Sequence, residues 1–128
     1  MNFKGIHRLG DLQLQILKVL WARKEAAVTD VHAVIHVQPA LAYTTIATML
    51  RKMEQRGLVT HRLEGRTFIY RAAVTEDQVE RGMAEHVLDR VFNGRLADLV
   101  SDLLREREVD AEELERLSRV ISDRRKRP

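Results

Sequence analysis

Residues 43–57 read YTTIATMLRKMEQRG, and they predict an amphipathic helix that ends at a glycine. Helix positions are about 100° apart, and an arc of roughly 100° then holds the apolar side chains Ile46, Met49, Leu50 and Met53. The opposite side is polar and basic, with Thr44, Thr45, Thr48, Arg51, Lys52 and Gln55. A helix with such a face fits the major groove of B-DNA, where hydroxyls and cations can meet base edges and phosphates.

Two β-rich segments follow this helix, LVTHRL at residues 58–63 and TFIYR at residues 67–71. The connection Glu64-Gly65-Arg66 contains the glycine that a tight hairpin turn favours, because glycine adopts a positive φ without strain. Arg62 and Arg66 flank the turn. A basic hairpin of this kind would lie along the sugar-phosphate backbone or enter a minor groove. We expect Phe68 and Tyr70 to pack within the hairpin or against the core.

Two further helices are predicted before residue 43. Residues 11–23 carry leucine, isoleucine and valine at helical spacing. Thr29 is expected to be the N-cap of a second, short helix, and Pro39 to break the chain after it. The order of three helices and a glycine-turned hairpin predicts a mainly α fold with a small β-hairpin wing, which is a winged helix-turn-helix.

The chain changes character after Val74. Residues 1–74 hold 11 Lys and Arg against 5 Asp and Glu, whereas residues 75–128 hold 11 against 14. The later part predicts helices only, with Thr75 and Gln78 at capping-box spacing and Asp110 as a further N-cap. We therefore expect a winged helix DNA-binding domain at residues 1–74 and a helical dimerisation region with a basic tail at residues 75–128.

The leucines and valines of this later part predict a dimer. About fifty residues cannot bury that much apolar surface alone, and a second copy would cover it through an isologous interface. It would also place two DNA-reading helices about one DNA turn, roughly 34 Å, apart. The expected interface residues are Val87, Leu88, Val91, Leu96, Leu99, Val100, Leu103, Leu104, Leu114, Leu117 and Ile121. The alternative is that these helices fold back on their own winged helix.

Several motifs together resemble the penicillinase and methicillin-resistance repressor family, BlaI/MecI/CopY. They are LGDL at 9–12, VLW at 19–21, VTDVH at 28–32, AYTTIATMLRKM at 42–53, GLV at 57–59, EGRTFIY at 64–70, VFNG at 91–94 and LV at 99–100. The resemblance covers nearly the whole chain. It implies a transcriptional repressor whose homodimer binds a palindromic double-stranded DNA operator, often with TACA/TGTA-type half-sites.

The resemblance also implies roles for individual residues. The residues that would face bases are Tyr43, Thr44, Thr45, Thr48 and Arg51, and those that would contact phosphates are Lys52, Arg62 and Arg66. The resemblance further implies release from DNA by an upstream signal, through a signalling protease that leads to a cut in the dimerisation region. The cut would fall near Asn93-Gly94-Arg95-Leu96, whose dipeptides differ from the family's cut site. The copper-responsive branch uses C-terminal cysteines, and this sequence has none.

Other classes of function find little support in the sequence. No nucleophile elbow, Walker loop or metalloprotease helix is present, so we expect no enzyme and no cofactor. The sequence contains no run of eighteen apolar residues, so it predicts no membrane span. The start of the chain lacks a secretory signal, and both features fit a cytoplasmic protein.

Two alternatives to a simple repressor stay open. His32 and His36 have the i, i+4 spacing of a zinc pair in a metal- or ligand-gated regulator, but without a third ligand nearby we expect no metal site. The second alternative is a winged helix used only for protein–protein contact.

Overall fold

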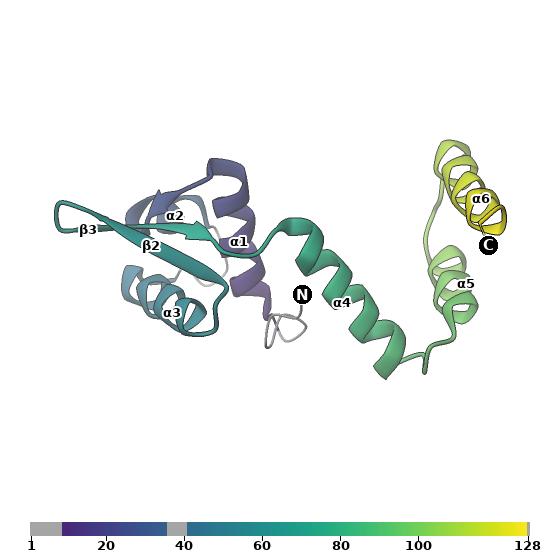
Figure 1. The fold of residues 1–128 in the computed structure, drawn as a ribbon, viewed down its shortest axis with the longest axis horizontal. Coiled ribbons are helices and arrows are strands. Elements are labelled where there is room, and N and C mark those ends of the chain that lie inside the picture. Colours follow the sequence, from purple (N-terminus) through teal and green to yellow (C-terminus); the bar gives the residue numbers. More distant parts are fainter. Residues whose placement is uncertain (1–8, 36–40, 128) are drawn as a thin grey trace. The chain divides into compact units, whose positions relative to one another are not determined.

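The computed structural model describes residues 9–35 and 41–127, which form two compact units. The first unit extends to His86 and the second begins at Val87. The elements of the first unit are α1 (Asp11–Arg23), β1 (Ala26–Ala27), α2 (Val28–Val34), α3 (Tyr43–Gln55), β2 (Val59–Glu64), β3 (Thr67–Ala72) and most of α4 (Glu76–Arg90). The second unit holds the end of α4 together with α5 (Leu96–Glu106) and α6 (Ala111–Arg125) (Figure 1).

The first unit is built around one apolar core. Helices α1, α2 and α3 contribute fully buried side chains such as Ile16, Val31 and Leu50, and the base of the hairpin adds Leu58 and Val59. The apolar arc predicted for α3 is the buried one, with Ile46, Leu50 and Met53 at 0% exposure. Burial of this stripe explains why a helix with so polar an outer face is stable.

A three-stranded antiparallel sheet completes the unit, in the order β1-β3-β2. Strands β2 and β3 form the predicted hairpin, with Glu64 opposite Thr67 and with Gly65 at φ +63° in the turn. This hairpin projects from the helical part as the wing (Figure 1). Strand β1 was not expected, because two alanines carry no alternating pattern, yet Ala26 pairs with Tyr70.

The helix ends follow the sequence with one exception. Gly57 has a φ of +79°, and the amides of Gly57 and Leu58 donate to the carbonyls of Glu54 and Met53, which is a Schellman motif. Thr75 caps α4 and Asp110 caps α6, as predicted. The expected N-cap at Thr29 was wrong: α2 begins at Val28, and the Asp30 carboxylate instead accepts the amide hydrogen of Ala27, at 3.1 Å.

Helix α4 begins as part of the first unit. Val79 is 1% exposed and belongs to its core, and Met83 packs against that core. The first unit therefore continues past residue 74, where the sequence suggested a boundary. Pro39 and His36, to which the sequence analysis assigned roles, lie outside the described residues.

The second unit has a different character, because none of the residues in α5 and α6 is buried. Apolar side chains line two hollows within it, one of about 790 Å³ that includes Leu96, Leu104 and Ile121, and one of about 530 Å³ that includes Leu103 and Leu117. Stable helices normally bury such stripes. A single copy of the unit thus leaves its apolar faces uncovered.

Candidate nucleic-acid interface

Helix α3 presents its polar face to solvent. Tyr43, Thr44, Thr45, Arg51 and Lys52 are exposed, and Thr48 is half-buried. A guanidinium nitrogen of Arg51 lies 3.4 Å from the Thr48 hydroxyl, so this side chain runs back along the helix. All six residues that the sequence assigned to the recognition helix therefore occupy one element, on the side away from the core.

His32 supports the start of this helix. Its Nε2 lies 2.8 Å from the carbonyl oxygen of Leu41, and its ring meets the Tyr43 ring edge-on, with centroids 6.3 Å apart. A carbonyl only accepts hydrogen bonds, so Nε2 carries the hydrogen and is not free to bind a metal ion. Within residues 9–35 and 41–127, no group of three metal-ligating side chains exists.

The wing is held to α3 by a cluster that the sequence analysis did not identify. Nδ1 of His61 lies 2.8 Å from both carboxylate oxygens of Glu54, near the end of α3. The His61 ring stacks on Phe68, with centroids 4.0 Å apart and planes at 7°. Tyr70 lies beside them, 2% exposed, and burial raises the pKa of its hydroxyl. As predicted, Tyr70 packs in the core and Phe68 packs within the hairpin, where it remains 38% exposed.

Arg62 lies on the other face of the wing, since successive side chains of a strand point to opposite sides. Its guanidinium contacts both carboxylate oxygens of Glu25, at 2.8 and 3.3 Å, and Glu64 at 3.3 Å. The hydrogen bonds from Arg62 lower the pKa of Glu25, and the same bonds raise the pKa of Arg62. Arg62, which the sequence analysis predicted to contact phosphate, is thus paired with carboxylates of the chain itself.

A groove joins the recognition helix to the tip of the wing. It has a volume of about 450 Å³, and its walls come from the start of α2, from α3 and from the hairpin. It brings together Tyr43, Arg51 and Arg66, three of the predicted site residues. Among the described residues Arg66 has no ion-pair partner. Thr29, which the sequence predicted to be a helix cap, also lines the groove.

A three-helix core, a polar third helix and a wing beside it define the class of winged helix DNA-binding proteins. The Penicillinase repressor family model matches residues 9–123. This chain therefore belongs to the penicillinase repressor family, whose members are DNA-binding transcriptional repressors and not enzymes.

Individual relatives agree with this assignment. The penicillinase repressor of Bacillus licheniformis is 26% identical over 124 residues, which covers 97% of each chain. The transcriptional regulator BlaI of Mycobacterium tuberculosis is 30% identical over 119 residues, which covers 91% of this chain and 84% of that protein. A solved structure described as a possible transcriptional regulator for arsenical resistance shares the fold, with a TM-score of 0.54 at 22% identity, and covers 80% of this chain and 97% of that one.

None of the described helices is long and apolar enough to cross a membrane.

Proposed function

We propose that two copies of this chain bind a palindromic operator in the cytoplasm and repress transcription until an upstream signal releases them. The groove between α3 and the wing carries this proposal, because it places Arg66 and Arg51 on one concave surface that can follow a phosphate backbone into the major groove. Tyr43, Thr44, Thr45, Thr48 and Arg51 would read bases, and Lys52 and Arg66 would contact phosphates. Arg62 would reach phosphate only by leaving Glu25.

The second copy would cover the open apolar faces of α5 and α6. Leu103 and Leu114 are 49% and 45% exposed in a single chain, and Leu96, Leu104 and Ile121 line an open apolar hollow. Val87 in α4 and Val91 just after it are exposed as well. The half-buried members are Leu88, Leu99, Val100 and Leu117. An isologous interface built from these residues would remove them from water.

Footprinting on a palindromic duplex tests the dimeric arrangement. Two protected half-sites with centres about 34 Å apart along the helix axis are expected of a dimer that places two α3 helices in successive major grooves. A single protected half-site of constant length, even at saturating protein, would contradict it.

Release would follow a cut in the connection between α4 and α5. Asn93, Gly94 and Arg95 are exposed, and the first two have positive φ angles of 50° and 80°. Cleavage there would separate the winged helix from α5 and α6, so the pair of winged helices would lose its shared anchor. A chain with a site for a sequence-specific protease inserted between Gly94 and Arg95 should therefore lose tight operator binding once it is cut. Cleaved protein that binds as tightly as the intact chain would contradict release at this position.

A further inference from the structure

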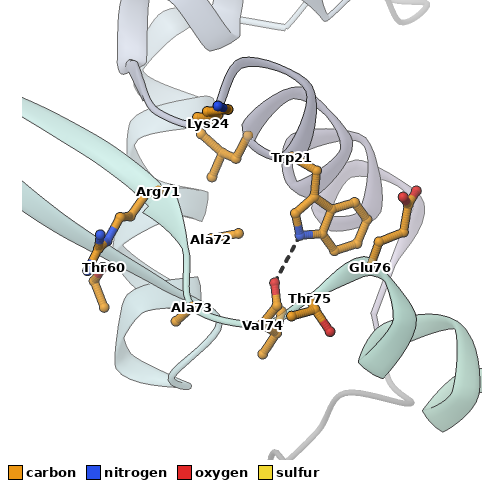
Figure 2. A pocket seen from close by; sticks show the side chains of 10 residues that line it. Trp21, Lys24, Thr60, Arg71, Ala72, Ala73, Val74, Thr75 and Glu76 are labelled. Atoms are coloured by element: carbon orange, nitrogen blue, oxygen red, sulfur yellow. Dashed lines mark hydrogen bonds between the residues drawn. The ribbon is translucent and has the colours of Figure 1, made fainter.

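A second cavity lies in the first unit, away from the groove between α3 and the wing. It has a volume of about 660 Å³, within the range of small-molecule sites. Its walls come from three places: the end of α1, the base of the hairpin, and the residues that lead into α4. Figure 2 shows the side chains arranged around its opening, with Trp21 across from Thr60 and Arg71 in this view.

This cavity is an open hollow with an apolar side, formed by Trp21 and by the alanines at the base of the hairpin. Leu20 belongs to the core behind this surface and is 1% exposed, whereas Ala72 and Ala73 are small enough to leave space in front of it. The indole of Trp21 forms one wall, and its Nε1 donates a hydrogen bond to the carbonyl oxygen of Val74 at 2.9 Å (Figure 2). That bond fixes the orientation of the ring, so an apolar ligand would meet a wall already in place.

Two cations from different elements reach the same cavity, Lys24 at the end of α1 and Arg71 on β3. One carboxylate, Glu76 at the start of α4, also lines it, so the cavity carries more positive than negative charge. Neither cation is in an ion pair within the described part of the chain: Glu25 pairs with Arg62, although the charge of Arg71 also helps to lower the pKa of Glu25. Lys24 has a φ of 72° and a ψ of −47°, a strained conformation for a residue with a Cβ. Strained residues gather at ligand sites, where the surrounding structure holds them in place.

We propose that this cavity binds a compact, mostly apolar carboxylate, with its rings or chain against Trp21 and its carboxylate between Lys24 and Arg71. A neutral molecule of the same shape would gain the apolar contact but not the pairing with the two cations. The inference concerns the first unit alone, and it does not depend on the proposed dimer or operator.

The chain supplies its own probe, because Trp21 is its single tryptophan. We would titrate the full-length protein with diphenylacetate, and in parallel with the neutral 2,2-diphenylacetamide, and follow Trp21 emission. The expected result is a saturable change with the acid and several-fold weaker binding of the amide. No saturable change with the acid, or equal affinity for both compounds, would overturn the proposal.

Charge-removing variants locate the site. Lys24→Gln and Arg71→Gln should each weaken binding of the acid several-fold and leave binding of the amide unchanged. Lys18→Gln is the matched control, since it removes an exposed cation of α1 that does not line the cavity, and it should bind the acid as the wild type does. Thermal melts verify that each variant is folded. If Arg71→Gln does not fold, the binding result for Lys24→Gln tests the proposal by itself. Wild-type affinity in the charge-removing variants would overturn the proposal.

Discussion

At the scale of single residues, Lys24 is the position where the backbone is most constrained. A lysine at a φ of 72° has a conformational energy cost of about 1–3 kcal/mol, which glycine avoids. The greater freedom of glycine in the unfolded chain offsets part of the stability gained by the substitution. Lys24→Gly should therefore raise the free energy of unfolding by about 1 kcal/mol in urea denaturation. Lys24→Ala removes the same side chain but keeps the strain, and it should not stabilise the protein. Equal stabilisation by both would show that the backbone is not the cause.

Glu25 restrains the wing through Arg62. Both side chains are about half exposed, so their pairing adds little stability, but it places a carboxylate where phosphate would bind. Glu25→Gln should strengthen DNA binding several-fold at low salt, measured by fluorescence anisotropy, because it leaves Arg62 with one carboxylate partner, Glu64, in place of two.

The matched control for this prediction is Glu80→Gln, which removes an exposed carboxylate of α4 that is in no ion pair with the described residues. The net charge changes equally in both variants. If the effect is local to Arg62, Glu25→Gln must raise the DNA affinity more than Glu80→Gln does. Equal gains in affinity would mean that only net charge matters.

At the scale of elements, α3 and the wing divide the work of recognition. Arg51 lines the groove beside Arg66, whereas Lys52 is exposed on α3 outside it. Arg51→Ala should weaken binding and change the preferred site. Lys52→Ala should weaken all sequences about equally and reduce the slope of log affinity against log salt by about one. Titrations of both variants on operator and scrambled duplexes measure this, and an unchanged slope for Lys52→Ala would contradict the docking of α3.

Sequence patterns predicted the elements whose signals are local. The apolar arc of α3, the glycines at 57 and 65, and the caps at Thr75 and Asp110 each depend on residues a few positions apart, and the structure confirms them. Contacts between distant residues left no such signal. Strand β1 forms because Tyr70 and Ile69 pair with two alanines, and the Glu25–Arg62 contact joins residues from different elements.

The misplaced cap shows why local rules can fail. Threonine is a good N-cap, but the Asp30 carboxylate satisfies the Ala27 amide, so α2 begins before Thr29. Thr29 instead lines the groove between α3 and the wing. The sequence does not show this, because it depends on where the wing lies relative to α2. The partnership of His61 with Glu54 and Phe68 was missed for the same reason, since it depends on how the hairpin folds against α3.

At the scale of the whole molecule, the apolar faces of α5 and α6 make assembly the property to test. Leu103→Glu would place a charge in the proposed interface and should give a monomer at micromolar concentration by sedimentation velocity, with the helical content unchanged. Arg119→Glu adds an acidic side chain to α6 about 160° from Leu117 and should leave the dimer intact. A dimeric Leu103→Glu variant would place the interface elsewhere.

The central claim is that two copies of this chain recognise a palindromic operator through α3 and the wing. A mobility-shift titration against a palindromic TACA/TGTA-type duplex and a scrambled duplex, each at two salt concentrations, tests it most directly. The account predicts tight binding to the palindrome with two chains per duplex, and weaker, more salt-sensitive binding to the scrambled sequence. Equal affinity for both duplexes, or no binding at low salt, would contradict it.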